Sequence, residues 1–400
     1  MIEVCRRCHE AAAREFEKTV SLEPSNTNHW HALGLMYLRA DCPVEALRAF
    51  DEALGINTDD LVALTYSHDA LCTMGHFKEA QRRIGRALEF DPDNILAIKH
   101  IADDRSARGL VRGEEGKNTR QLIRQALRLA PDAPDSQESL ARYHIFRGEW
   151  KKGIAVLQKF TEQHLSCPRG WYHYARWLFH AGESQTAADA IMKAYALYQN
   201  DAKIYQAACE ILPSVGKLDD LQPLLEEMLR RFPEQWSVWT TAGLVLAEWF
   251  KDGERACTVA SRGPQLQPHL ADAWFQHGRV LALAGKHREA ITALEEGWTW
   301  LPEGEGYAQS TPAAACLGES YRALGDERES RAWYEKSVRH ALELIAINPA
   351  IAHYWQGKAL ERLGDVPRAR QAYRTALRHH LLHPTRREVK ESLKILQTRV

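Results

Sequence analysis

Residues 274–302 read WFQHGRVLALAGKHREAITALEEGWTWLP, and this stretch decides the fold. Trp274 and Gly278 are four residues apart, a spacing that places them on one face of a helix. Gly285 follows seven residues later and is typical of a helix end, and Ala290 opens a second apolar stripe. The stretch therefore predicts two short helices joined by a tight turn.

The same pattern recurs along the chain at a fixed period. Pro24 and Pro92 are 68 residues apart, and Pro268 and Pro302 are 34 apart. We expect a proline to close the helical stretch of each unit, at positions 24, 92, 131, 233, 268, 302 and 349. Further copies of the aromatic, small-residue and alanine frame lie at 30–53, 171–194, 318–334 and 357–376. A period of this length is typical of stacked helical repeats.

The frame resembles the tetratricopeptide repeat, whose pattern is W-x2-L-G-x2-Y, then A-x3-F, then P. Trp30, Gly34, Tyr37, Ala46 and Phe50 stand at those positions. The resemblance implies an all-α solenoid, a right-handed superhelix of about ten helix-turn-helix repeats whose first helices line a concave groove. The predicted repeats are 27–60, 61–94, 95–133, 134–167, 168–201, 202–235, 236–270, 271–304, 311–349 and 350–384.

Each unit needs close packing between its two helices. Small residues of the first helix let the second helix approach; they are Gly34, Ala102, Ala141, Ala175, Gly243, Gly278 and Gly318. Alanines of the second helix do the same, namely Ala46, Ala80, Ala187 and Ala290. Because one unit cannot bury its apolar stripe alone, neighbouring units are expected to stack.

Three repeats depart from the period. The third carries about five extra residues around 112–117, which we expect to form a polar loop. The seventh carries one extra residue, and the ninth has a second helix extended through 337–345. A glycine-containing connection at 302–312 precedes the ninth repeat.

The ends complete the predicted organisation. Residues 1–26 hold a partial repeat (its second helix only), 27–304 repeats one to eight, 305–384 repeats nine and ten, and 385–400 a capping helix. Val389, Leu393 and Leu396 share one face of that last helix. For the missing first helix two explanations stay open: the sequence is a fragment of a longer chain, or a partner covers the exposed face.

Composition narrows the class of protein. Formal net charge is −1, whereas a general binder of nucleic acid or of an anionic membrane needs a basic surplus. No apolar run reaches membrane-spanning length, and the first residues show no long apolar segment of a secretory signal. Eight cysteines are too dilute for a disulfide framework. We expect a cytoplasmic protein that binds neither membrane nor nucleic acid.

Few sequence motifs indicate catalysis or the binding of a cofactor or metal. Residues Cys5 to His9 match the C-x-x-C-H haem-attachment pattern, but the absent export signal counts against haem. A zinc site there needs two more ligands, and Cys42 and Cys72 belong to later repeats. The eighteen histidines, including His29, His31, His68, His76 and His100, are interpreted as scattered surface residues. No nucleophile elbow or phosphate loop occurs, so we expect no catalytic residue, cofactor or metal.

The concave face is the predicted binding site. In the resembling family, positions 2, 5, 9 and 12 or 13 of the first helix contact the ligand. Here the candidates are Arg142, Arg169, Tyr172, Arg176, Phe179, Lys203, Phe275, Arg279, Arg322, Tyr354 and Lys358. Guanidinium and tyrosine side chains suit an acidic or C-terminal peptide segment of a protein partner. The alternative is that Glu138 and Glu210 neutralise these cations within the array.

Three other functions are possible for a repeat array besides this non-enzymatic interaction scaffold. A clamp for chaperone tails needs lysine and asparagine at fixed positions, but position nine reads Leu35, Asp69, Asp103, Arg142, Arg176 and Glu210. A regulatory subunit of an enzyme is a second alternative, with the catalytic domain (for example a caspase-like peptidase or a transferase) on another chain. An RNA-binding array is the third, and the acidic entries count against it. The oligomeric state stays open.

Overall fold

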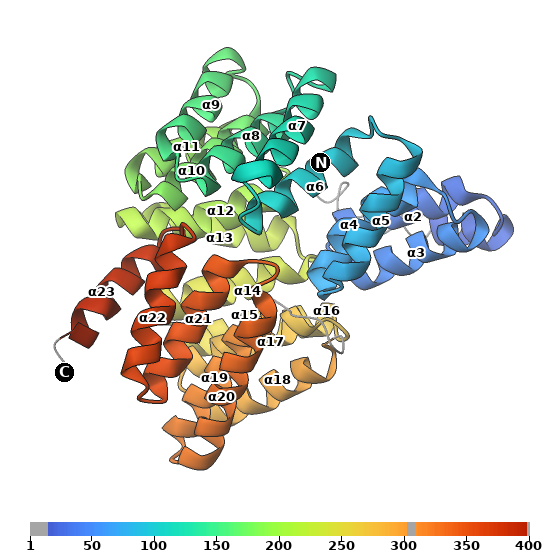
Figure 1. Ribbon diagram of the computed structural model, residues 1–400. Coiled ribbons are helices and arrows are strands. Elements are labelled where there is room, and N and C mark those ends of the chain that lie inside the picture. Colours follow the sequence, from blue (N-terminus) through green and yellow to red (C-terminus); the bar gives the residue numbers. More distant parts are fainter. Residues whose placement is uncertain (1–14, 302–308, 398–400) are drawn as a thin grey trace. The chain divides into compact units, whose positions relative to one another are not determined.

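The structure is a computed structural model that describes residues 15–301 and 309–397. Within those ranges every regular element is a helix, and no strand occurs (Figure 1). Two sequence features lie outside the described residues: the haem-like motif Cys5 to His9 and residues 302–308 of the connection.

The helices form antiparallel pairs that follow the predicted repeats. The pairs are α2 (Thr27–Arg39) with α3 (Pro43–Ile56), α4 (Leu61–Met74) with α5 (Phe77–Phe90), α6 (Ile95–Ala107) with α7 (Gly113–Leu129), α8 (Pro134–Phe146) with α9 (Trp150–Gln163), and α10 (Pro168–Ala181) with α11 (Ser184–Leu197). Then come α12 (Ala202–Ile211) and the 3₁₀ turn η1 (Leu212–Val215) with α13 (Leu218–Arg231), and α14 (Trp236–Val245) and η2 (Leu246–Phe250) with α15 (Gly253–Ala260) and α16 (Arg262–Leu266). The last pairs are α17 (Ala271–Leu283) with α18 (His287–Thr299), α19 (Ser310–Ala323) with α20 (Glu327–Leu344), and α21 (Pro349–Arg362) with α22 (Val366–Arg378), followed by α23 (Thr385–Gln397). The all-α, paired-helix fold is thus confirmed.

Small residues hold the two helices of a pair together, as predicted. A Cβ added to Gly34 would lie 2.7 Å from the ring of Phe50, and one added to Gly278 would lie 2.6 Å from Cγ of Leu294. The alanines predicted for the second helices, Ala46, Ala80, Ala187 and Ala290, have no exposed surface. Because any larger side chain would push the helices apart, these positions set the spacing within each repeat.

The expected polar loop in the third repeat is wrong. Residues 113–117 form the first turn and a half of α7, which begins at Gly113. The reason is a buried anchor ahead of the helix: Val111 is 1% exposed, and a Cβ on Gly116 would lie 2.4 Å from the Val111 carbonyl carbon. The extra residues therefore lengthen a packed helix.

The other length changes also fall inside helices. The surplus residue of the seventh repeat coincides with a π-helical turn, η2, after which Lys251 adopts a φ of 56°. A π turn holds one residue more than an α turn, so it absorbs an insertion. The extended second helix of the ninth repeat is confirmed as α20, with 18 residues. Pro349, however, begins α21 and does not close α20, because proline is well suited to the first helical position.

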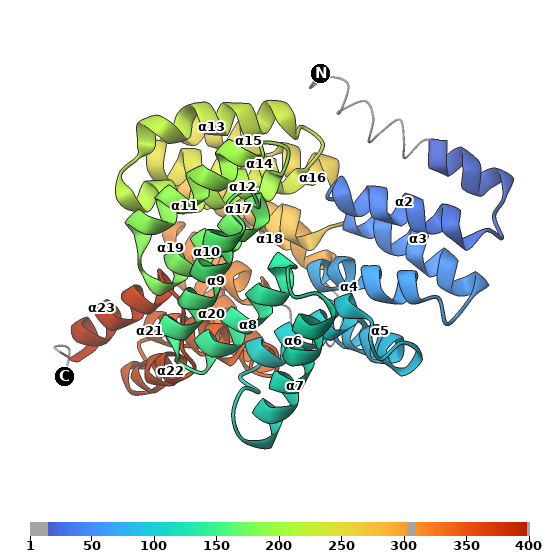
Figure 2. The same cartoon turned by 90° about the horizontal axis from the view of Figure 1, so that it is seen from above.

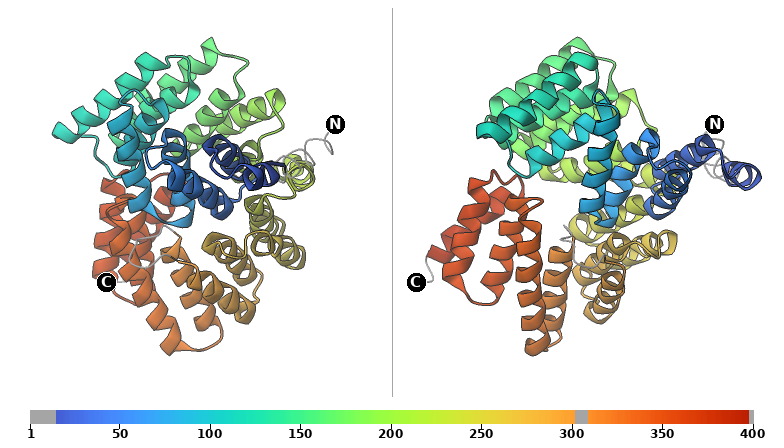
Figure 3. Two further views of the ribbon diagram at one scale, coloured as in Figure 1. Left: turned by 90° about the vertical axis from the view of Figure 1, so that its right-hand side faces the viewer. Right: turned by 45° about the vertical axis from the view of Figure 1, so that its right-hand side comes forward.

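The described contacts group the chain into two compact units, each built from two distant stretches. Unit 1 comprises residues 1–101 and 225–305, and unit 2 comprises 102–224 and 306–400. In unit 1, α2 and α3 lie side by side (Figure 2). In unit 2, α21, α22 and α23 lie side by side in the C-terminal part (Figure 3). The predicted domain ranges follow the order of the repeats, whereas these units follow spatial contact.

The C-terminal helix closes a core of its own. In α23, Val389 is 1% exposed, Leu396 has no exposed surface and Leu393 packs against the same cluster. The hydroxyl of Tyr354 in α21 donates a hydrogen bond to Glu388 at 2.7 Å. The amphipathic face predicted for this helix is thus the face that packs on the tenth repeat. Across the described residues, no helix combines the length and apolar character needed to cross a membrane.

Candidate functional site

Glu138 in α8 is the centre of a buried polar network in unit 2. Its side chain is only 4% exposed, and Oε1 accepts hydrogen bonds from Arg142 (2.9 Å) and from the indole N–H of Trp177 in α10 (2.9 Å). The Arg142 guanidinium lies 5.7 Å from the centre of the Trp177 ring. Because a buried carboxylate needs partners for its lone pairs, this network is a packing element between α8 and α10.

Arg142 is held in place by a second carboxylate. Asp103 of α6 lies 3.9 Å from Arg142 Nε and accepts a hydrogen bond from Ser139 at 2.7 Å. Desolvation opposes the charge of Arg142, but the Glu138 and Asp103 carboxylates outweigh it and raise the pKa of the guanidinium. The alternative of neutralisation within the array therefore holds for Arg142.

Arg176 of α10 has different surroundings. Its side chain is exposed, its Nη1 donates to the hydroxyl of Tyr172 at 3.3 Å, and its guanidinium lies 5.8 Å from the Tyr172 ring centre. Desolvation opposes its charge, yet interaction with Tyr172 and with Glu210 of α12 leaves the pKa of Arg176 raised. Burial raises the pKa of Glu210, and Arg176 partly offsets this. The three residues form a charged, accessible patch on first helices of adjacent repeats.

The remaining predicted cations, apart from the exposed Lys203, lie in ion pairs. Arg169 donates to Asp135 at 2.8 Å, Arg279 lies 2.7 Å from Glu248, Arg322 pairs with Glu319, and Lys358 lies 3.6 Å from Glu388. Arg279 and Phe275 belong to unit 1, whereas the other candidates belong to unit 2. The eleven predicted residues are therefore divided between the two units and do not form one described cluster.

Three predicted aromatic anchors are buried. Phe179 is 3% exposed, Phe275 4% and Tyr354 4%. Phe275 packs on Gly297, whose added Cβ would lie 2.8 Å from its ring, so it fills the space between α17 and α18. The expectation that these three line an open face is wrong, since at their positions the first helix faces a neighbouring element.

The chain's own C-terminal segment contacts the end of α10. The backbone N–H of His383 donates to the carbonyl of His180 at 3.1 Å, and Arg386 donates to the carbonyl of Ala181 at 2.9 Å. The Phe179 and His383 rings meet edge to face at 5.3 Å. Desolvation, with the nearby Arg176 charge, lowers the pKa of His180 to about 4. The turn that precedes α23 is thus held against the end of α10 by hydrogen bonds to main-chain carbonyls of α10.

Two stretches of the chain match a known family. Residues 138–202 and 317–380 match the family model described as tetratricopeptide repeat. Both stretches fall on the helix pairs described above. The two matched stretches are tetratricopeptide repeats.

Solved structures similar to this chain include one human and one yeast protein. The human IFIT1 dimer with m7Gppp-AAAA is 16% identical, with 88% of this chain and 90% of that chain covered and a TM-score of 0.46. Yeast Tom70 is 12% identical, with 99% and 93% covered and a TM-score of 0.48. No residue role is carried over from either protein.

Sequence reasoning missed two groups in this chain. The contact of His180 with His383 and of Ala181 with Arg386 joins positions 203 and 205 residues apart, so local spacing does not predict it. The prediction that His68 and His100 are surface residues is wrong: they are 5% and 7% exposed, and their ring centres lie 3.9 Å apart. The spacing of His68 and Cys72, four residues apart on one helix face, is the sequence signal that could have indicated this second group.

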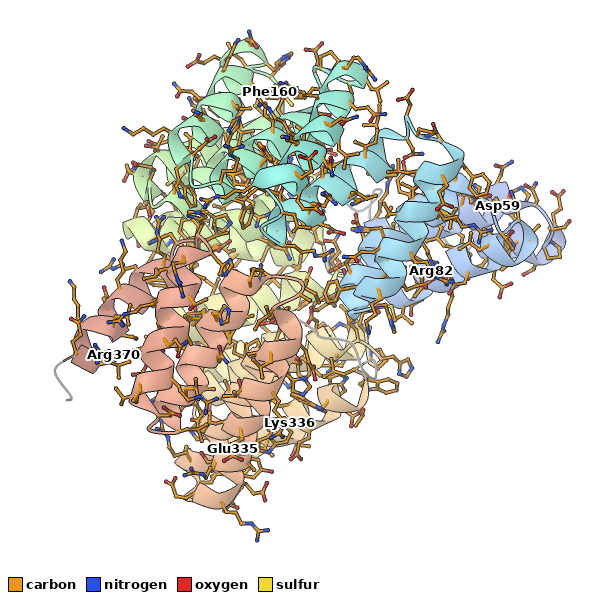
Figure 4. All side chains as sticks on the ribbon, in the orientation of Figure 1. Asp59, Arg82, Phe160, Glu335, Lys336 and Arg370 are labelled. Carbon is orange, nitrogen blue, oxygen red and sulfur yellow. The ribbon has the colours of Figure 1, made fainter. Side chains whose placement is uncertain are left out.

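Charged side chains also cover the second helices. Figure 4 labels Arg82 of α5 together with Glu335 and Lys336 of α20. Arg82 is 77% exposed and pairs with Glu79 of its own helix at 2.7 Å. Lys336 Nζ lies 4.2 Å from the Trp333 ring centre. Such contacts within one helix are typical of a solvated face.

Proposed function

We propose that this protein is a non-enzymatic scaffold that binds a peptide segment or a partner domain on its first helices. Within unit 2 the proposed anchor is Arg176 of α10, with Tyr172 and Glu210 beside it. The observation that carries the proposal is the environment of Arg176: its hydrogen-bond partner is the neutral hydroxyl of Tyr172, while Arg142 and Arg169 are bonded to carboxylates.

The chemistry of this patch selects a class of partner. A guanidinium binds a carboxylate through two parallel hydrogen bonds, and a tyrosine ring offers an apolar face beside it. An acidic side chain or a chain-terminal carboxylate therefore suits Arg176. Glu210 limits the site to ligands that do not place a second anion beside it.

A peptide selection tests the proposal. The full chain is immobilised, and a random peptide library with free carboxyl termini is selected against it. We expect enrichment of peptides with an acidic residue or an acidic end. Arg176→Glu should weaken their binding at least tenfold, because a repelling charge replaces the anchor. Arg374→Glu is the matched control, since Arg374 is an exposed arginine on a second helix, α22, and the net charge change is equal.

Two outcomes contradict the proposal. Equal peptide affinity of the wild type and Arg176→Glu would place the site elsewhere. Absence of any enriched peptide, together with salt-dependent binding of single-stranded oligouridine by the wild type, would make the protein an RNA binder. Circular dichroism of each variant checks that the helices are intact.

A further inference from the structure

Four side chains with metal-binding atoms meet in unit 1. His68, Asp69 and Cys72 lie on α4, and His100 lies on α6, the first helix of the next repeat. His68 and Cys72 are one helical turn apart and therefore share a face. The two histidines are buried, whereas the Asp69 side chain is 68% exposed, which leaves a route from solvent.

The distances between the donor atoms are short. Nδ1 of His68 lies 3.2 Å from Oδ1 of Asp69, and Nδ1 of His100 lies 3.9 Å from the same oxygen. Sγ of Cys72 lies 3.7 Å from Nε2 of His68 and 4.0 Å from its Nδ1. One ligand atom from each of His68, Asp69 and His100 lies within 4.8 Å of the others.

These separations are close to those of a tetrahedral metal site. Bonds of about 2.0–2.3 Å to nitrogen, oxygen and sulfur place neighbouring ligand atoms roughly 3.3–3.6 Å apart. With Nδ1 of His68 as the ligand atom, its 3.2 Å separation from Asp69 Oδ1 lies near that range. The 4.0 Å separation from Sγ of Cys72 and the 3.9 Å separation between His100 and Asp69 close with small rotations of the Cys72 and His100 side chains.

Charge and donor type also agree with a divalent ion. Asp69 and the thiolate of Cys72 together carry two negative charges, which a divalent cation neutralises, and the two imidazoles bind it in their neutral form. Two nitrogens, one oxygen and one sulfur form a donor set of intermediate softness, which suits zinc over calcium or magnesium.

We propose that His68, Asp69, Cys72 and His100 bind one zinc ion, which joins the first helices of the second and third repeats. Three ligands come from α4 and one from α6, so the ion closes a loop of about thirty residues between Cys72 and His100. Its expected effect is on stability, because metal binding to the folded state alone adds to the free energy of unfolding. This inference does not depend on the peptide site in unit 2.

Metal titration of the full chain tests the site. The background carries Cys5→Ser, Cys8→Ser and His9→Asn, so that the N-terminal motif cannot bind the ion. After chelator treatment, Zn²⁺ is titrated by calorimetry and Co²⁺ by absorbance. We expect one equivalent of each ion, a rise in melting temperature, and a near-ultraviolet cobalt–thiolate band.

Matched variants identify the ligands. Cys72→Ser should remove the cobalt–thiolate band and weaken binding at least tenfold, and Cys72→Ser with His100→Asn should abolish it. Cys167→Ser, which replaces another half-buried cysteine, should leave the band and the stoichiometry unchanged. Absence of saturable binding at one equivalent in the parent chain overturns the proposal and needs no core substitution. Persistence of the thiolate band in Cys72→Ser overturns it as well.

Discussion

The carboxylate of Asp41 accepts hydrogen bonds from both the backbone N–H and the hydroxyl of Ser237, a residue 196 positions further along the chain. Asp41 has a φ of 62° and stands where Gly75, Gly182 and Gly285 end other first helices. Ser237 lies in the first turn of α14, so the carboxylate also faces the positive end of that helix. A residue that is strained at its own turn thus caps a distant helix within unit 1.

Replacing Asp41 separates its two roles. Asp41→Gly relieves the left-handed backbone but removes the cap, and we expect a net loss of about 1–2 kcal/mol in the free energy of unfolding. Asp41→Asn keeps an acceptor and tolerates the same φ, so its loss should be smaller. Urea denaturation of both variants measures the difference. A glycine variant more stable than the wild type would show that the cap contributes less than the strain.

Two glycines should respond to alanine in opposite directions. A Cβ on Gly278 would lie 2.6 Å from Leu294, and we expect Gly278→Ala to lower the free energy of unfolding by about 1–3 kcal/mol. Gly85, in the interior of α5, has no atom within 4 Å of an added Cβ. Gly85→Ala should therefore stabilise the protein by about 0.5–1 kcal/mol through helix propensity. Thermal melting followed by circular dichroism compares the two, and a shift of the same sign in both would contradict the assigned packing.

The Glu138 network predicts a stability effect for Arg142. Arg142→Met leaves the buried Glu138 carboxylate without its guanidinium, and we expect a loss of about 3–5 kcal/mol. Adding Glu138→Gln removes the unpaired charge, and the double variant should regain part of that loss. Chemical denaturation of the single and double variants gives the coupling. If Arg142→Met were as stable as the wild type, Arg142 would have to be reassigned to the binding face.

Acidification should weaken unit 2 through His180. Its folded pKa of about 4 lies below the ordinary value of 6.5, so between these values the unfolded chain binds more protons. Stability therefore falls as pH drops from about 6.5 towards 4, by up to about 3 kcal/mol for this group. His180→Asn keeps a donor towards the His383 carbonyl, which lies 3.3 Å from Nδ1, and does not titrate. Urea midpoints at pH 7 and pH 5 should fall less for this variant; an identical fall in both proteins would exclude His180 as the cause.

The sequence predicted the repeats because each one must satisfy the same local packing rule. Gly34 against Phe50 and Gly278 against Leu294 recur at fixed spacing, so helix pairs and most of their bounds could be read directly. The α7 start could not, because Val111 looks like a loop residue until its burial is known. Fixed positions on a first helix located Arg176 correctly on an exposed face but also selected Phe179, which is buried.

Contacts between distant stretches of the chain could not be predicted from the spacing of residues along the sequence. The pairing of Arg142 with Glu138 follows from an i, i+4 relationship and was anticipated as an alternative. The contact of His180 with His383 and the meeting of His68 with His100 depend on how separate helices approach one another. A periodicity describes which side of a helix is apolar and carries no information about which polar residues meet across a gap.

The π turn at Leu246–Phe250 bears on how this chain can change over evolutionary time. One extra residue there is accommodated by a single wider helical turn. The following helix pair, α17 and α18, resumes the ordinary period. Insertions and deletions of one residue can therefore accumulate in individual repeats during evolution with little effect on the stability of the fold. Proteins that descend from one ancestral repeat array would then differ in the positions of such π turns while they keep the same order of repeats.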